Sequence, residues 1–140
     1  MDTISIAVTA IVSAIATAIA TSKMKDRSER TNAYKGFLQE IRQNIFLAKH
    51  NNEQQYGSAR TLFFRDDFWN MSKANGHFLD LPSNLQTLLY EVYTKQYEIN
   101  EDLNLVGKYM MLNTVQEKIK KELQPKLEEA EKLLEKRLDP

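Results

Sequence analysis

Few side chains in this sequence are suited to chemistry. There are two histidines, His50 and His77, and no cysteine. His50 lies in a polar stretch at a predicted helix end, His77 follows a glycine in a loop, and neither has a second histidine or a cysteine at helical spacing. No HExxH, GxSxG or glycine-rich phosphate motif occurs. The sequence therefore predicts no metal and no cofactor.

One acidic doublet, Asp66-Asp67, lies among aromatic residues and is the remaining candidate for acid–base chemistry. Adjacent residues on a helix point about 100° apart, so the two carboxylates would not share a substrate. Arg60 and Arg65 are close in sequence, and an ion pair with one of them is the ordinary explanation. We therefore predict that the protein is not an enzyme.

The charge composition argues against a nucleic-acid-binding protein. The charges of the 19 basic and 19 acidic residues cancel, whereas nucleic-acid-binding proteins usually carry a basic excess. No nucleic-acid partner is predicted. The lack of cysteine excludes disulfide frameworks and fits a reducing compartment.

The N-terminal segment is the strongest signal in the chain. Residues from Thr3 to Ser22 carry no charge, and a helix of that length rises about 30 Å, the thickness of a bilayer's hydrocarbon core. Its five Ile and two Val contribute about −2 to −4 kcal/mol on the insertion scale, an advantage that its seven Ser and Thr erode. We predict a transmembrane anchor over residues 1–22, with a narrow margin of free energy.

On a helical wheel the large aliphatic side chains of this segment gather on one side, and small residues fill most of the rest. Small residues let helices approach closely in lipid, and hydroxyls bond across the interface or back to their own helix. The predicted membrane-packing residues are Ser5, Thr9, Ala10, Ser13, Ala14, Thr17 and Ala18. The alternative is an anchor whose small residues face lipid without consequence.

Two further readings of the segment stay open. A cleaved signal peptide has acceptable cleavage patterns at Ala16-Thr17-Ala18 and Ala18-Ile19-Ala20, but the start of the chain carries only Asp2 rather than basic residues. A soluble or filament-forming coiled-coil helix would use a heptad-like seam of Ile4, Val8, Ile11 and Ile15.

Basic residues follow the apolar run directly. Residues 23–30 form a juxtamembrane segment with four cations, Lys23, Lys25, Arg27 and Arg30. Because short basic flanks stay on the cytoplasmic side, we expect a single-pass protein with its N-terminus outside and its C-terminal domain in the cytoplasm. The same cations would either lie against anionic headgroups or form a merely solvated run.

The rest of the chain is predicted to be all-α, a small bundle of three to four helices over residues 31–112 and an amphipathic, charged C-terminal helix over 113–140. Apolar stripes at a 3.6-residue period indicate helices to about Tyr56, from Ser58 to Lys73 and from about Leu81 to Met110. Gly76 suits a left-handed helix end, and Gly107 need not break its helix. Pro125 predicts a kink in the last helix, which either packs on its own domain or offers its apolar face to a partner.

The second predicted helix is rich in aromatic residues. Phe63, Phe64, Phe68, Trp69 and Phe78 exceed what one helix face can bury. Either they form an ordinary core, or some of them contact a partner or the membrane interface. Phe64, Phe68 and Trp69 are the candidate partner surface.

Two amides flank the apolar stripes, Asn44 beside Ile45 and Asn100 beside Ile99. A buried amide must find hydrogen-bond partners, and paired amides fix the register of packed helices. We therefore expect a structural role for both.

Several short patterns follow the anchor and its basic flank in order: Glu40-Ile41-Arg42-Gln43-Asn44, Trp69, Gly76, Leu81-Pro82, Leu88-Leu89-Tyr90 and Ile99-Asn100. With these the chain resembles a loose group of small, uncharacterised, membrane-anchored helical proteins of prokaryotes, over most of residues 1–112. The resemblance implies a fold and an anchor. It implies no activity, substrate or catalytic residue.

Two function hypotheses follow. The first is a membrane-anchored interaction module, an adaptor or accessory subunit without catalysis, whose partners are membrane lipid and a protein. The alternative is a self-associating homo-oligomer, either a small pore or a filament, built on the N-terminal Ile/Ala/Thr helix.

Overall fold

The computed structural model describes residues 3–55, 61–107 and 110–139, with side chains from residue 5. The secondary structure of these residues is helical, and its elements are α1 (Thr3–Asn52), α2 (Asp67–Ala74), the 3-10 helix η1 (His77–Asp80), α3 (Ser83–Leu105), α4 (Leu112–Lys118), the π-helical turn η2 (Ile119–Leu123) and α5 (Gln124–Leu138). The all-α prediction is confirmed.

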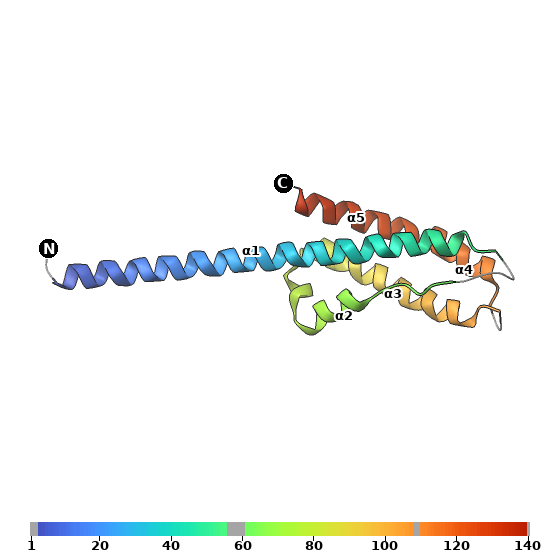
Figure 1. The fold of residues 1–140 in the computed structure, drawn as a ribbon, viewed down its shortest axis with the longest axis horizontal. Coiled ribbons are helices and arrows are strands. Elements are labelled where there is room, and N and C mark those ends of the chain that lie inside the picture. The colour runs from blue at the N-terminus through green and yellow to red at the C-terminus, as the bar shows by residue number, and fades with distance from the viewer. Residues whose placement is uncertain (1–2, 56–60, 108–109, 140) are drawn as a thin grey trace.

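α1 is a single uninterrupted helix of 50 residues, which at 1.5 Å per residue is about 75 Å long. Its C-terminal half packs most extensively against α5, which returns along it, and also contacts α2, η1 and η2 (Figure 1). Its N-terminal half extends beyond the bundle. No break separates the predicted anchor, the basic segment and the bundle, because no proline and only one glycine occur within α1.

The core lies between α1, α3 and the C-terminal helices. Its largest side chains, each with less than 2% of its surface exposed, come from all three: Phe37, Ile41, Leu85, Leu89, Ile99, Ile119, Leu123, Leu127 and Leu134. The apolar face of α5 thus packs on its own domain, which was one of the two alternatives; the other was a face offered to a partner. Among the charged residues of the C-terminal helices, Glu117 and Lys121 meet at 2.9 Å, and Lys126 pairs with Glu91 of α3 at 2.9 Å.

The helix disturbance near Pro125 has a defined form. The π-helical turn η2 ends at Leu123, and Pro125 occupies the first turn of α5. A proline lacks the N–H that would bond one turn back, so the wider π turn accommodates it without ending the helix.

Two sequence predictions about helix ends need correction, and one is confirmed. α1 ends at Asn52, before Tyr56, which lies outside the described residues together with Gly57 and Ser58. α3 ends at Leu105 rather than Met110, because Gly107 adopts a φ of 86° that a helix does not contain. The left-handed conformation predicted for Gly76 is confirmed by its φ of 81°.

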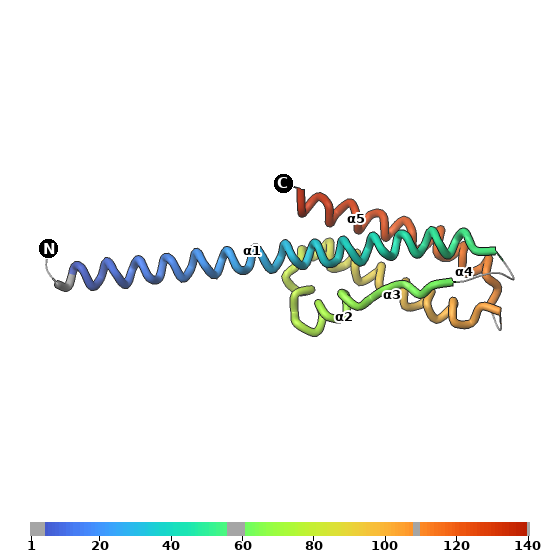
Figure 2. The backbone as a smooth tube through the Cα atoms, viewed as in Figure 1, coloured from blue at the N-terminus to red at the C-terminus, as the bar shows by residue number. Residues whose placement is uncertain are grey.

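The largest error concerns residues 61–66, which were predicted to be helical and instead form an extended segment. In Figure 2 the tube straightens over these residues before α2 begins. Three asparagines, two on α1 and one on α3, each form hydrogen bonds with both the backbone N–H and the C=O of one residue of the segment. Asn51 holds Leu62, Asn100 holds Phe64 and Asn44 holds Arg65, at 2.8 to 3.2 Å. These side chains supply the hydrogen bonds that a helix would have supplied.

Asn44 also connects the two helices that hold the segment. Its Nδ2 donates to Gln96 Oε1 at 2.9 Å, and Gln96 Nε2 donates to the Arg65 carbonyl at 3.2 Å. Asn44 is fully buried and Gln96 is 1% exposed. The expected structural role of Asn44 and Asn100 therefore operates through the extended segment as well as between helices.

A buried carboxylate fixes the start of α2. Glu40 of α1 is 5% exposed and accepts hydrogen bonds from the backbone N–H groups of Phe68 and Trp69 at 2.8 and 3.2 Å, and from the Tyr93 hydroxyl at 2.8 Å. Phe68 and Trp69 lie in the first turn of α2, where N–H groups lack helical acceptors. Glu40 thus caps α2 from another helix, and a negative charge suits that end of the helix dipole.

The contact between Glu40 and Tyr93 predicts a pH effect. Burial, followed by the adjacent Glu40 carboxylate, raises the pKa of Tyr93 well above its ordinary value of 10. Above about pH 10 the unfolded chain loses this proton while the folded chain keeps it, so the contribution of Tyr93 to stability decreases as pH rises. Tyr93→Phe is expected to be less stable than wild type at pH 8, with a gap that narrows by up to about 1.4 kcal/mol per pH unit above pH 10. Urea unfolding of both proteins at pH 8 and pH 11 measures the gap; a constant gap would contradict the expectation.

Gly36 is needed where the ring of Phe68 packs on α1. A Cβ at residue 36 would lie 2.1 Å from Phe68 Cζ, and the ring is wedged edge-on against Phe37 at a centroid distance of 4.8 Å. Gly36→Ala is therefore expected to destabilise the bundle by about 1–2 kcal/mol, because the clash outweighs the roughly 1 kcal/mol of helix propensity gained. Thermal unfolding by circular dichroism measures this. Adding Phe68→Leu should recover part of the loss, and a stabilised Gly36→Ala protein would show that the ring moves freely.

Candidate interaction surfaces

The N-terminal half of α1 is uncovered. Every described side chain from Ser5 to Ser28 is exposed, and the large aliphatic side chains of the apolar run are 51–60% exposed. Among the described helices α1 alone is long and apolar enough to cross a membrane. Exposed apolar surface of this extent is unusual on a soluble monomer.

The predicted membrane-packing residues lie on this uncovered part without contact to the bundle. Two of their hydroxyls are already bonded within α1: Thr9 Oγ1 donates to the Ser5 carbonyl and Thr17 Oγ1 to the Ser13 carbonyl, each at 2.9 Å. Such back-bonding hides polar hydrogens from an apolar surrounding. Ala10, Ala14 and Ala18 remain exposed along the same helix.

The candidate partner surface from the sequence is not an exposed surface. Phe64 and Trp69 are 4% and 6% exposed, and Phe68 is half-buried. Trp69 stacks on Tyr93 with centroids 4.6 Å apart and meets Phe78 edge-on at 4.9 Å. These aromatics are core residues, which was the other reading of the cluster.

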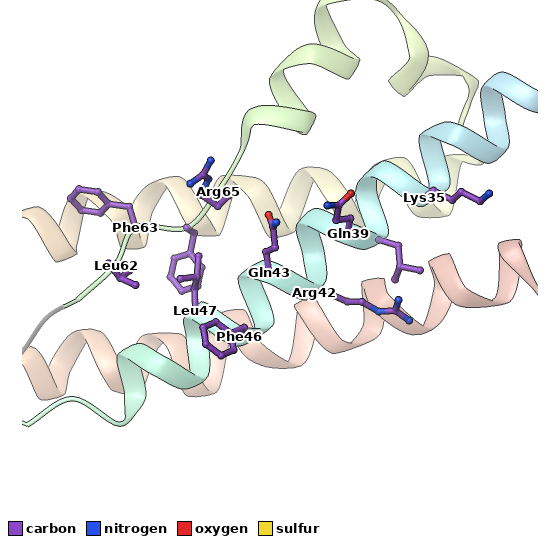
Figure 3. Close-up of a pocket in the computed structure, with 11 residues that line it drawn as sticks. Lys35, Gln39, Arg42, Gln43, Phe46, Leu47, Leu62, Phe63 and Arg65 are labelled. Atoms are coloured by element: carbon purple, nitrogen blue, oxygen red, sulfur yellow. The ribbon is translucent and has the colours of Figure 1, made fainter.

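A groove lies instead between α1 and the extended segment. It has a volume of about 970 Å³, and Figure 3 shows its labelled lining: Lys35, Gln39, Arg42, Gln43, Phe46 and Leu47 come from α1, and Leu62, Phe63 and Arg65 from the segment. Phe46 and Phe63 are 68% and 56% exposed. Three cations line this groove and no carboxylate does. We refer to it as the α1–segment groove.

Two of the cations at the α1–segment groove have partners outside its lining. Arg42 pairs with Glu135 at 2.8 Å and Glu131 at 3.4 Å, and these contacts raise its pKa. Arg65 pairs with Asp67 at 2.9 Å, as the ordinary explanation of the acidic doublet expected. Lys35 has no ion pair among the described residues.

The groove was not predicted from the sequence, because one of its sides is formed by the extended segment. The one available signal was Phe46, a large apolar residue that lies outside the apolar stripe of α1. His77 lies 3.9 Å from Asp80, and no group of three metal-type ligands occurs in the described ranges.

The four cations of the predicted juxtamembrane segment all lie on the exposed stretch of α1 that precedes the bundle's core. The structure brings α5 to this place: Arg137 and Leu138 share a hollow with Lys23, Arg27 and Arg30. This approach was not predictable from local patterns, since residues 23–30 and 137 are far apart in the chain.

Comparison of the chain with protein-family models, with curated proteins and with solved structures finds no match, so the resemblance to small anchored helical proteins stays a prediction.

Proposed function

We propose that the protein is a membrane-anchored helical interaction module, an adaptor or accessory subunit that performs no catalysis. The observation that carries this proposal is the contrast within α1. One half supplies core residues to the bundle, and the other exposes a row of Ile and Val to which no described residue packs. Lipid is the natural cover for an uncharged apolar helix of this length.

The proposed orientation places the N-terminus outside and the bundle in the cytoplasm. It is supported by the four cations that follow the apolar run. Membrane fractionation with protease treatment of a C-terminally tagged protein tests anchor and sidedness together. The tag should pellet with membranes and resist protease until the membrane is permeabilised. A tag in the supernatant, or one digested on intact cells, contradicts the proposal.

The α1–segment groove is the proposed docking face. Its exposed Phe46 and Phe63 and its cationic lining favour a partner segment that presents apolar side chains flanked by carboxylates. Pull-down in mild detergent should lose the partner in the Phe46→Gln/Phe63→Gln variant. Tyr90 and Tyr97, exposed aromatics of α3 outside the groove, provide the matched control in Tyr90→Gln/Tyr97→Gln. Equal capture by both variants would exclude the groove.

Self-association through the anchor is the second proposal, supported by the exposed small residues Ala10, Ala14 and Ala18. It predicts a discrete oligomer, a small pore or a filament, that dissociates when the three become leucine. Light scattering in detergent distinguishes this assembly from a monomer.

A further inference from the structure

A basic hollow lies where the last turn of α5 meets α1, directly after the uncharged run. Its volume is about 700 Å³, and its charged lining is Lys23, Asp26, Arg27 and Arg30 of α1 with Arg137 of α5. Four cations thus share the hollow with one carboxylate. At 1.5 Å per residue, Lys23 to Arg30 cover about the first 12 Å of helix beyond Ser22.

These four cations have no acidic partner across elements in the described part of the chain. Several cations elsewhere in the bundle do, as Arg42 has Glu135, Lys118 has Asp102 and Lys126 has Glu91. No ion pair within the described ranges engages Lys23, Arg27, Arg30 or Arg137. Four like charges around one hollow repel each other, so an anion bound there would relieve that repulsion.

We propose that this hollow binds the phosphate headgroup of an anionic phospholipid; the proposal rests on the membrane anchor proposed above. The hollow begins where the apolar run ends, which places Lys23 and Arg27 at headgroup depth. Side chains on a helix lean toward its N-terminus, so the arginines of α1 lean toward the bilayer. Guanidinium groups bind phosphate through paired hydrogen bonds. Arg137 then ties the free end of α5 to the membrane surface.

The experiment uses the full chain in nanodiscs of phosphatidylcholine alone or of phosphatidylcholine with phosphatidylglycerol. Amide hydrogen exchange is followed over the last two turns of α5, residues 131–138. Bound headgroup should slow this exchange by about threefold or more, since a ligand stabilises the state that binds it. Arg137→Gln and Arg27→Gln should each remove the difference between the two discs. Lys120→Gln, an exposed cation outside the hollow, should keep it.

Each other outcome overturns the proposal in a distinct way. Equal exchange in both discs excludes a headgroup site while leaving the anchor intact. Equal protection by inorganic phosphate, added to phosphatidylcholine discs, assigns the hollow to a free anion. A chain that enters neither disc refutes the anchor and the lipid source together. If Arg27→Gln lowers the melting temperature in detergent without lipid, the cations serve the C-terminal dipole of α5 instead.

Discussion

Replacing Ile11 and Ile15 with lysine is expected to move the full-length protein from the membrane pellet to the supernatant. Each lysine near the centre of a span costs about 2.5–3.5 kcal/mol, and each lost isoleucine removes about 0.5 kcal/mol of favourable transfer. The sum of about 6–8 kcal/mol exceeds the −2 to −4 kcal/mol that the large aliphatic side chains provide. Sedimentation of cell membranes with immunodetection measures the result.

The matched control adds the same two charges at the end of the run. Thr21→Lys/Ser22→Lys extends the basic flank and should leave the protein in the pellet. Both variants should keep the wild-type melting temperature, because residues 11, 15, 21 and 22 are exposed and lie outside the core. Release of the wild type by mild detergent separates lipid anchoring from a filament, which would still sediment. Equal sedimentation of the two variants would contradict the anchor.

Asn44→Ala is expected to cost about 3–5 kcal/mol of unfolding free energy. The Arg65 N–H and Gln96 Oε1 each lose the partner that Asn44 provides, and the Arg65 carbonyl keeps only the 3.2 Å bond from Gln96. Each polar group left unsatisfied in a buried place costs about 1–3 kcal/mol. This is a large fraction of the 5–15 kcal/mol that holds a typical domain together.

Urea unfolding measures that cost, and Gln43→Ala serves as the control because Gln43 is the exposed neighbour on the same helix. Amide exchange at Leu62, Phe64 and Arg65 adds a local readout, which should accelerate in Asn44→Ala alone. Equal stability of the two variants would show that the extended segment is held by packing rather than by its amide clamps.

The helices that bury an apolar stripe were predictable from the sequence. The stripe of α3 and that of the C-terminal helix place Leu85, Leu88, Ile99, Leu127 and Leu134 in the core. A period of 3.6 residues is a local property, so one segment suffices to recognise it. Gly76 could be predicted for the same reason, since a glycine after a helix commonly takes the left-handed conformation.

The extended segment was not predictable in this way. Leu62, Phe63 and Phe64 have the bulk of a helix face, and what keeps them extended is a set of amides on α1 and α3. Asn44 and Asn51 lie seven residues apart and so share a face of α1, which was the available signal. Reading it requires knowing which backbone those amides meet, and that is a property of the tertiary fold.

The candidate site depended on the same information. Because the segment is extended, Phe63 faces solvent beside Phe46 while Phe64 and Trp69 enter the core. The aromatic cluster was recognised from the sequence, but Phe64 and Trp69 were placed on a candidate partner surface that did not include the exposed Phe63. Glu40 was also overlooked, since a glutamate within a helical stripe does not reveal that another helix will start against it.

The absence of a hinge in α1 has a mechanical consequence. If the apolar run sits in a bilayer, the bundle is joined to it by a rigid rod, and a rotation or tilt of the rod turns the groove by the same angle. The azimuth of the docking face is then set by helical phase: one residue inserted between the run and the bundle would swing the groove by about 100° while raising it only about 1.5 Å. The number of residues between the two halves of α1 therefore determines which way the groove faces far more strongly than it determines its height above the bilayer.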